Sequence, residues 1–434
     1  MKRKNLGLLI CLFISLIFIL YNNLKFLPSD NNSFIEDILI STSQIEIDGN
    51  EELEAYCYDG VNNGSSWDLA YIIENDDNGY EIRNTDKNLI IRNCTFELER
   101  LTLTKCDNIK IVNCSFKLCF LGIHLDGIRQ VNESIAISNC EFTECSEGIF
   151  SEFTQEIKIN NCIFNNTSFV GLRQFQTNYT TIYNNSFYNT GWSSIRCSDC
   201  DNNNISNNRF INGNKSAIFI GGDSKGRWGK DNVVSNNFIE NCKGPGIYID
   251  GKENMIASNK IIHCESDGIQ LGITFHDWGL YAVPSYNKII FNNISLNKGN
   301  GIYLEGKLVS VGSMVTDRNY WLATAYNEIY NNTIMDNEEN GILLEFPCHD
   351  NMIYNNKILF NKQYCIVDRS STFVWFLGSP NDYFQNGNCS VFYEVPSSKD
   401  KQIFSFNITI ILGLLLFVSF LFYRKNIIFN KKSR

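Results

Sequence analysis

The 434-residue sequence predicts an all-β fold, a parallel β-helix solenoid, because two short phrases alternate along it with a period of about 22 residues. The first phrase is an apolar pair, one or two polar residues, Asn-Cys or Asn-Asn, and then Phe or Ile. The second places a Gly or another small residue before an apolar alternation, as in Gly301-Ile302-Tyr303-Leu304. Both phrases alternate with a period of two, which predicts strands rather than an amphipathic helix. Strands this short bury an apolar face only when each coil stacks on the next.

One position of the first phrase is expected to form a ladder through the stack. Asn tolerates left-handed turns, and its amide both donates and accepts hydrogen bonds, so coils about 4.8 Å apart let such side chains bond to one another. In the first coils Cys takes this place, and we favour packing as a small apolar group over a redox or metal site there. The position is held by Cys94, Cys114, Cys140, Cys162, Asn185, Asn208, Asn237, Asn259, Asn292, Asn332 and Asn356.

The 16 Cys residues would suggest disulfides if the domain is exported. Their pairing is not readable from the spacing, although Cys197 and Cys200 are close enough in the chain to pair locally. The Cys/His spacing of a zinc site is absent, and the 4 His residues are scattered over different coils. No metal site is therefore predicted.

Apolar segments near both ends predict membrane anchoring. Residues 6–20 form an uncharged apolar run that basic residues precede, and Ile403–Tyr423 form a second run that a basic tail follows. The positive-inside rule then places both termini in the cytoplasm and the central domain outside the cell, so the predicted location is the cell membrane. The first segment is expected to be an uncleaved signal anchor rather than a signal peptide, because no small-x-small cleavage site follows it.

The chain is thus expected to contain several segments in a fixed order. These are an N-terminal signal anchor or signal peptide (1–24), an N-terminal cap with the first strands (25–78), the parallel β-helix (79–377), a juxtamembrane linker (378–402), a transmembrane helix (403–423) and a basic cytoplasmic tail (424–434).

The charge and the motifs exclude several function classes. The formal net charge is −10, and the basic termini make the exported part still more acidic. Such a surface repels nucleic acid, so the expected partners are carbohydrate or cell-envelope components, with the membrane contacted through both termini. No Ser-His-Asp order, phosphate-cradling Gly loop or dinucleotide fingerprint is present.

A family resemblance appears near the start of the solenoid. The segments IEIDGN (45–50), YIIEN (71–75), YEIRNT (80–85) and LIIRNC (89–94) resemble the start of right-handed parallel β-helix proteins of the pectate-lyase-like superfamily. Within it, the chain resembles the NosD-like, carbohydrate-binding and sugar-hydrolase type of archaeal and bacterial surfaces. The resemblance implies a right-handed solenoid of about 11–13 coils over residues 40–375, here flanked by one membrane helix at each end.

The resemblance does not imply one function. The superfamily hosts lyases, hydrolases, epimerases, adhesins and copper-site maturation factors on the same scaffold. The polygalacturonase pattern is not met, because Asn84-Thr85-Asp86 occurs in an early coil but no later Asp-Asp pair, Gly-His-Gly or Arg-Ile-Lys follows. This argues against a pectin hydrolase.

Three long insertions predict a binding wall. Extra residues fall at 222–231, 273–286 and 306–326, each directly after the second phrase, so the loops should leave one corner of nearby coils. Aromatic rings beside polar groups suit sugar stacking, although these Trp residues could instead only pin long loops to the solenoid. The expected ligand-binding residues are Trp228, His276, Asp277, Trp278, Arg318 and Trp321, with Tyr248 and Tyr303 on the adjoining strands.

Outward acids on the same strands are the candidate catalytic residues. Glu305 and Glu345 lie one coil apart, which places their carboxylates about 5 Å apart, near the spacing of a retaining glycosidase. Asp250, two coils from Glu305, approaches the wider spacing of an inverting enzyme. The stacked acids could equally bind calcium as a cofactor or form a solvated strip. Arg173 over Arg196 could also serve a lyase by neutralising a uronate.

The sequence therefore predicts a membrane-anchored extracellular β-helix protein that binds carbohydrate or serves as a cell-surface adhesin or envelope scaffold. The alternative is a polysaccharide-active enzyme, a glycoside hydrolase or lyase acting on surface glycans. Whether the chain is an enzyme is left open.

Overall fold

The computed structural model describes residues 44–57, 59–128, 135–222, 229–276, 280–312, 317–370, 381–386 and 389–393. At residues 275, 276, 280–282, 308–312, 317–321 and 393 it describes the backbone alone. No helix within these ranges is long and apolar enough to cross a membrane. The predicted membrane segments 1–24 and 403–423 and the predicted tail 424–434 lie outside them.

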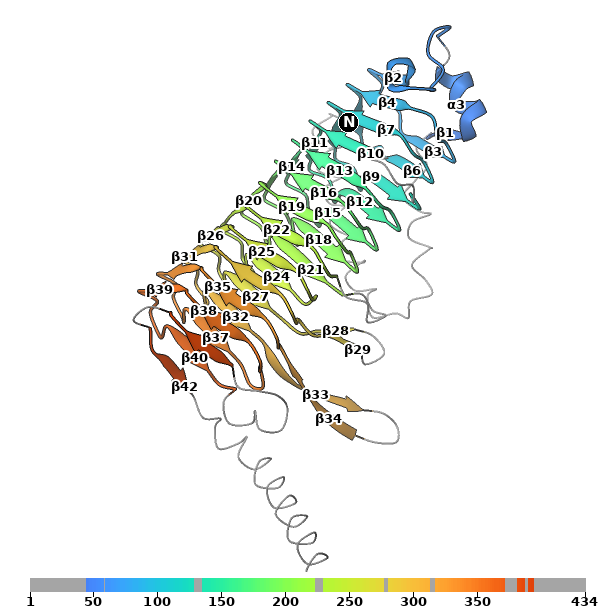
Figure 1. Ribbon diagram of the computed structural model, residues 1–434. Coiled ribbons are helices and arrows are strands. Elements are labelled where there is room, and N and C mark those ends of the chain that lie inside the picture. The colour runs from blue at the N-terminus through green and yellow to red at the C-terminus, as the bar shows by residue number, and fades with distance from the viewer. Residues whose placement is uncertain are drawn as a thin grey trace, which may run out of the picture. The chain divides into compact units, whose positions relative to one another are not determined.

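The described chain folds as an all-β solenoid with three parallel sheets, which we call A, B and C (Figure 1). Within the described residues the sheets have 14, 13 and 11 strands, in agreement with the expected number of coils. Sheet A contains β1 (Ile45–Asp48), β3 (Tyr80–Arg83), β6 (Leu101–Thr104), β9 (Leu121–Asp126), β12 (Glu147–Glu152), β15 (Val170–Phe175), β18 (Ile195–Ser198), β21 (Ile218–Gly221), β24 (Ile247–Ile249), β27 (Ile269–Leu271), β32 (Ile302–Leu304), β37 (Ile342–Leu344), β40 (Ile366–Asp368) and β42 (Val391–Tyr393).

The chain runs from sheet B through sheet C to sheet A in each complete coil. Sheet B contains β2 (Tyr71–Glu74), β4 (Leu89–Arg92), β7 (Ile109–Val112), β10 (Ile135–Ser138), β13 (Ile157–Asn160), β16 (Thr181–Tyr183), β19 (Asn204–Ser206), β22 (Val233–Ser235), β25 (Met255–Ala257), β30 (Lys288–Ile290), β35 (Glu328–Tyr330), β38 (Met352–Tyr354) and β41 (Asp382–Phe384). Sheet C contains β5 (Thr95–Glu97), β8 (Ser115–Lys117), β11 (Glu141–Thr143), β14 (Ile163–Asn165), β17 (Ser186–Tyr188), β20 (Arg209–Ile211), β23 (Phe238–Glu240), β26 (Lys260–Ile262), β31 (Asn293–Ser295), β36 (Thr333–Met335) and β39 (Lys357–Leu359).

Four further strands and two short helices complete the described elements. The hairpin β28 (Thr274–His276) with β29 (Leu280–Ala282) and the hairpin β33 (Gly306–Gly312) with β34 (Asp317–Ala323) are antiparallel. Helix α3 (Gly49–Cys57) and the 3-10 turn η2 (Trp67–Leu69) lie among the first strands. The stacked strands begin with β1 and reach β42, so they extend beyond residues 79–377 at both ends.

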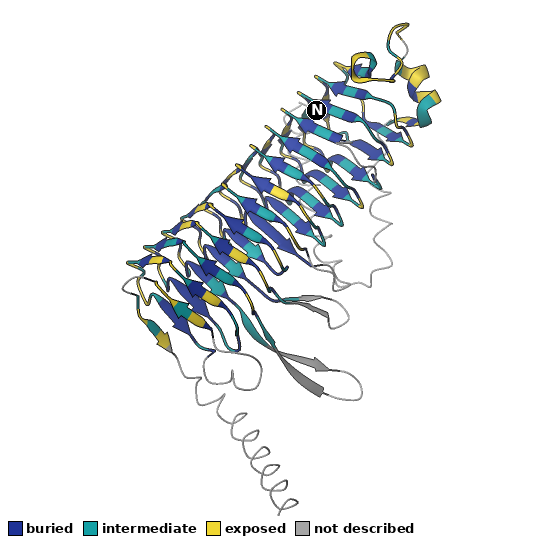
Figure 2. Ribbon diagram, viewed as in Figure 1, coloured by how far each residue is buried: buried dark blue, intermediate teal, exposed yellow. Residues whose placement is uncertain are grey.

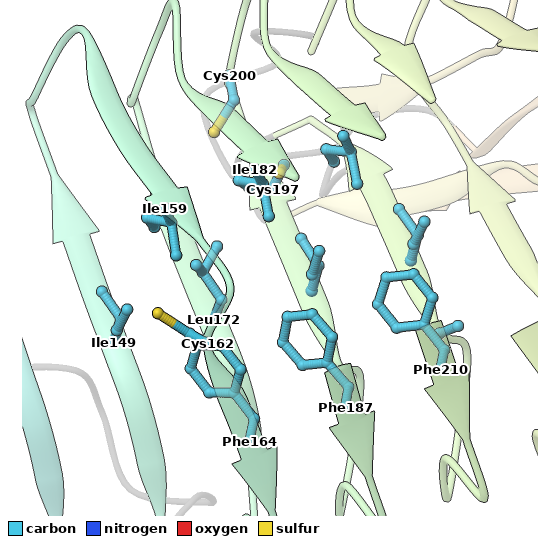
Figure 3. Packing of buried hydrophobic residues seen from close by; sticks show 14 of the residues in the cluster. Ile149, Ile159, Cys162, Phe164, Leu172, Ile182, Phe187, Cys197, Cys200 and Phe210 are labelled. Atoms are coloured by element: carbon cyan, nitrogen blue, oxygen red, sulfur yellow. The ribbon is translucent and has the colours of Figure 1, made fainter. Parts of the chain in front are cut away.

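The core is a column of identical side chains stacked from coil to coil. Buried and partly exposed residues alternate along the strands, as the period of two predicts (Figure 2). In sheet C the buried rings of Phe164, Phe187 and Phe210 stack at centroid distances of 4.5 and 4.9 Å (Figure 3). The second phrase begins with Gly because this column leaves no room: a Cβ at Gly148 would lie 2.7 Å from a ring atom of Phe164 and 2.5 Å from the carbonyl oxygen of Gly171.

The expected Asn ladder is present at the corner between sheets B and C. The Nδ2 group of Asn237 donates to Oδ1 of Asn259 at 3.0 Å and to the carbonyl oxygen of Ile205 at 2.9 Å. Its backbone N–H donates to the same Oδ1 of Asn259 at 3.0 Å. Each Asn therefore donates to a backbone carbonyl of the coil before it and to the side-chain oxygen of the Asn in the coil after it.

The Cys residues of the first coils perform part of the same task. The Sγ of Cys114 donates to the carbonyl oxygen of Ile91 at 3.7 Å, which is the bond that Nδ2 makes in the Asn coils. The two parts of the ladder join where the N–H of Cys162 donates to Oδ1 of Asn185 at 2.8 Å. These thiols are thus buried hydrogen-bond donors of the core.

The sequence analysis did not identify two further ladders. One occupies the corner between sheets A and B, where the bond from Nδ2 of Asn254 to Oδ1 of Asn287 measures 3.2 Å; its members are Asn203, Asn232, Asn254, Asn287, Asn327, Asn351 and Asn381. A shorter one links Asn297, Asn337 and Asn361. All described cysteines are free, so the local pair considered at Cys197 and Cys200 is not formed; the Cys197 thiol donates to Oε1 of Gln174 at 3.2 Å.

We expect a substitution in the ladder to destabilise the fold more than one on the outer face. Asn237→Leu or Asn259→Leu removes the donor and acceptor that neighbouring coils use, and leaving buried partners unpaired should cost on the order of 1–3 kcal/mol. Gln270→Ala, on the outward side of β27, should cost under about 0.5 kcal/mol. Urea unfolding of each variant measures both effects, and equal losses for the two kinds of variant would contradict the ladder.

Candidate functional site

The candidate site is the outward face of sheet A, which carries two rows of aligned side chains. Strand pairing places these residues in register, as the sequence analysis expected. The first row reads His124, Phe150, Arg173, Arg196, Phe219, Tyr248, Gln270, Tyr303 and Leu343. The second row reads Asp126, Glu152, Phe175, Ser198, Gly221, Asp250, Gly272, Glu305 and Glu345.

The N-terminal part of the first row is a stack of side chains around Phe150. The ring of His124 stacks on Phe150 at a centroid distance of 5.3 Å, and the guanidinium of Arg173 lies 3.7 Å from the same ring centroid. Both side chains also have acidic partners: Nε2 of His124 lies 3.1 Å from Glu152, and Nε of Arg173 donates to Glu147 at 2.9 Å. Burial raises the pKa of Glu147, and the Arg173 charge opposes that shift. This part of the face is therefore internally neutralised.

The next coils form a second stack around Phe219. The guanidinium of Arg196 lies 4.2 Å from the Phe219 centroid, and the ring of Tyr248 stacks on Phe219 at 5.3 Å. Arg196 also lies 4.6 Å from the ring centroid of Trp192, so two aromatic rings hold its guanidinium. Burial lowers the pKa of Arg196, and Asp250 opposes this shift. Within the described part of the chain, no carboxylate forms an ion pair with Arg196 at 4.0 Å or less.

The border of the face nearest sheet C is aromatic and basic. Trp192 lies 5.0 Å from Phe169 between ring centroids, and Nζ of Lys215 lies 5.4 Å from the Trp192 ring. The sequence analysis missed Trp192 and Phe169. They stand three residues before Leu172 and Ile195, which pair with each other in sheet A, so a comparison of equivalent repeat positions would have found them.

Asp250 is a fully buried acid at the middle of the face, with 0% exposure. Its Oδ1 accepts the N–H of Gly222 at 2.7 Å, whereas Oδ2 has no hydrogen-bond partner among the described residues. Burial raises the pKa of Asp250 to about 7, with the Thr274 hydroxyl, the Gly222 amide and the Arg196 charge acting in the opposite direction. Its carboxyl group can therefore change protonation state near neutral pH.

Two glycines make room for this acid and its neighbour. In the second row Asp250 stands between Gly221 and Gly272. A Cβ at Gly221 would lie 2.1 Å from Oδ1 of Asp250, and one at Gly272 would lie 2.3 Å from the hydroxyl oxygen of Tyr248. Tyr248 thus lies over the backbone of the following coil, where its hydroxyl is 3.2 Å from that of Thr274. Burial raises the pKa of Tyr248, which keeps its hydroxyl protonated.

The other two candidate acids are engaged by groups of the protein. Glu305 accepts the N–H of Ile273 at 2.8 Å, and Nζ of Lys307 lies 3.9 Å from its other oxygen. Glu345 accepts a bond from Arg369 at 2.6 Å. Each carboxylate is thus already bound by a group of the protein. The described residues contain no group of three or more His, Cys, Asp or Glu side chains that could hold a metal ion.

The three insertions leave the solenoid at one corner. Residues 223–228 follow β21, the hairpin β28–β29 follows β27, and the hairpin β33–β34 follows β32, and these strands lie close together in sheet A (Figure 1). Both hairpins project from the same side of the solenoid (Figure 1). The insertion corner lies opposite the border formed by Phe169 and Trp192, because each sheet A strand runs from one to the other.

The expected ligand-binding side chains of these insertions stay predictions. Trp228, Asp277 and Trp278 lie outside the described residues. The backbone of His276 ends β28, while Arg318 and Trp321 pair with Val311 and Leu308 in the longer hairpin; their side chains are not described. Tyr303, in contrast, lies on the described face, two coils from Tyr248.

Solved structures share this architecture. The A-module of the mannuronan C-5 epimerase AlgE6 from Azotobacter vinelandii superposes with a TM-score of 0.58 at 11% identity, over 80% of this chain and 94% of that one. The PL6 family polysaccharide lyase Pedsa3628 from Pseudopedobacter saltans gives a TM-score of 0.50 at 13% identity, over 82% of this chain and 94% of that one. At such identities the likeness shows the fold alone. No curated protein matches the sequence significantly.

A family model identifies the repeats directly. The model described as "Right handed beta helix region" matches residues 30–187, 99–228, 174–319 and 272–399. These overlapping matches follow the three-sheet stack over most of the chain, and they bear out the resemblance to the pectate-lyase-like superfamily. The chain therefore belongs to the right-handed β-helix family.

Proposed function

We propose that this protein binds a carbohydrate chain along the outward face of sheet A. The observation that carries the proposal is the Arg196 guanidinium, which two aromatic rings hold on the face without a carboxylate partner among the described residues. A guanidinium fixed in this way presents its N–H donors in a planar array that suits a carboxylate or a pair of sugar hydroxyls. The two polysaccharide-active proteins with this fold support carbohydrate as the ligand class.

The same stacking limits how a sugar can be bound. Phe150 lies between His124 and Arg173, and Phe219 lies between Arg196 and Tyr248, so both faces of each ring are covered within the stack. Contacts between a sugar and the outward face of sheet A would therefore be polar and would involve Arg196 and its neighbours. Trp192 is likewise covered by Phe169, Arg196 and Lys215, so the rings proposed to stack on a sugar are those of the insertion residues Trp278 and Trp321.

Charge favours short-range recognition over long-range attraction. The net charge of −10 repels a polyanion at a distance, whereas Arg196 acts only on a group in contact with it. The face thus suits a neutral glycan or one with isolated acidic groups better than a densely charged polymer.

We further propose that the solenoid stands on the cell surface as an adhesin or envelope scaffold, anchored by residues 403–423 and by the N-terminal segment. The support is the sequence pattern of apolar runs flanked by basic residues. Protease added to intact cells should then degrade the solenoid while tags at both termini stay protected. A C-terminal tag that is cleaved from outside would refute this topology.

The second candidate function is a polysaccharide-active enzyme, and Asp250 is the specific observation that favours it. A buried carboxyl with one free oxygen and a pKa near 7 is suited to move a proton at neutral pH. Glu305 and Glu345 remain proposed catalytic acids beside it, although the protein already engages both. In this alternative, Arg196 positions the sugar next to Asp250.

For binding, we expect Arg196→Gln to weaken glycan affinity about tenfold or more, because it removes charge-assisted hydrogen bonds. Trp278→Ala and Trp321→Ala should each abolish retention on a glycan array while leaving the circular-dichroism spectrum unchanged, since the insertions lie outside the stacked core. Arg209→Gln is the matched control: Arg209 lies 4.7 Å from the ring of Phe238 on sheet C, so binding should be unaffected. Equal losses for Arg196→Gln and Arg209→Gln would refute sheet A as the binding face.

For catalysis, we expect Asp250→Asn, Glu305→Gln and Glu345→Gln each to retain binding but to stop release of reducing ends or of unsaturated products from a glycan that the wild type cleaves. If Asp250 acts as the base, wild-type turnover should rise as pH increases through about 7, because the carboxyl loses its proton there. A wild type that binds glycans but releases no product at any pH tested would leave the adhesin as the function.

A further inference from the structure

Within the described part of the chain, the cysteines divide into buried thiols and a few that solvent can reach. All are free, and only Cys57, Cys365 and Cys389 are not fully buried. Two of these three, Cys365 and Cys389, are neighbours: burial and the adjacent Cys365 thiol raise the pKa of Cys389, while their Sγ atoms donate to the carbonyl oxygens of Ile358 and Ser390, respectively. They form an accessible pair at the C-terminal end of the stack.

The backbone holds this pair at a distance that a disulfide can span. Cys365 directly precedes β40, and Cys389 stands two residues before β42, which pairs with β40 in parallel with Ile366 opposite Val391. A strand spacing of about 4.8 Å and an offset of one residue place the two Cα atoms about 6 Å apart. Disulfides span Cα distances of about 4.4–6.8 Å. The stacked rings of Tyr364 and Phe392, 4.5 Å apart, keep the same two strands together.

The strand that this pair would fasten is held less firmly than the inner strands of sheet A. Among the described strands, β42 lies at an edge of sheet A and pairs with β40 alone. Sheet C ends with β39, so the last described coil has no sheet C strand between β41 and β42. Asn386 anchors this connection by donating to the carbonyl oxygen of Ile353 at 2.9 Å, and Cys389 follows it.

We propose that Cys365 and Cys389 are a modification site that forms a disulfide and locks β42 onto the stack in an oxidising environment. The co-reactant is a small-molecule disulfide, for which oxidised glutathione is the probe. One protein thiolate attacks a sulfur of the probe, forms a mixed disulfide and releases one glutathione. The second thiolate then attacks the protein sulfur of that mixed disulfide and releases the other glutathione. The two protein thiols lose two protons and two electrons, and the probe gains them as it becomes two glutathione thiols.

A buried pair elsewhere in the chain supplies the internal control. Cys242 and Cys264 are also neighbours on successive coils, but both have 0% exposure. Like Cys365 and Cys389, these two thiols lie beside each other, but solvent does not reach them. They should therefore stay reduced while the protein is folded.

The test uses the full-length wild type, purified in reductant and then incubated with oxidised glutathione under native conditions. After the free thiols are alkylated and the protein is digested, we expect a peptide pair that joins Cys365 to Cys389. Cys242 and Cys264 should be alkylated only after unfolding. Recovery of Cys365 and Cys389 as alkylated thiols, or of both as separate glutathione adducts, would overturn the proposal. This measurement uses the wild type alone, so it does not depend on whether a variant folds.

Two variants test the consequence for β42. Limited proteolysis of the oxidised wild type should release the segment that contains β42 several-fold more slowly than proteolysis of the reduced protein. Oxidised Cys365→Ser should carry one glutathione on Cys389, form no cross-link and show no protection, whereas Cys242→Ser should behave as the wild type. Protection of oxidised Cys365→Ser equal to that of the wild type would show that the cross-link does not hold β42.

Discussion

The fold depends on one constraint, which is that the polar groups buried at each corner find their partners in the next coil. A three- or four-residue strand cannot bury its backbone alone, and the sheets supply only the bonds between strands. The corner residues supply the rest: Asn237 bonds to the backbone of one neighbouring coil and to the side chain of the other. Because this arrangement repeats at each coil, it fixes the register of every coil on the previous one.

That register is what assembles the candidate site. Arg196, Phe219 and Tyr248 come from three successive coils, and the strand register places them opposite one another. Placing a cation beside an aromatic ring then costs little further conformational entropy, because the backbone already aligns both side chains. Variation is left to the corner that follows the sheet A strands, where the hairpins β28–β29 and β33–β34 leave the solenoid without disturbing the stack.

The sequence was informative wherever a residue has the same surroundings in every coil. The period, the two phrases and the ladder from Asn185 to Asn356 follow from backbone geometry and apolar burial, which are local and repeated, so they could be predicted. The two rows on sheet A followed once the register was known. The side-chain stacks on sheet A could not be predicted. Arg173 contacts Glu147 and Arg196 contacts Trp192, and these choices depend on side-chain packing between coils. The place of the Asp250 carboxylate could not be predicted either, because it depends on the room left by the missing Cβ of Gly221 on the neighbouring coil.

The Asn ladder also determines where this protein can change its length. Between Asn208 and Asn332 each amide has an identical neighbour before and after it, so a whole coil could be duplicated or deleted there and every remaining amide would still meet its usual partner. At Cys162 and Asn185 this exchange fails, because a thiol donates but does not replace the accepting oxygen of an amide. Coils could therefore be gained or lost among the Asn coils, beside the insertions, while the Cys coils would keep a fixed order.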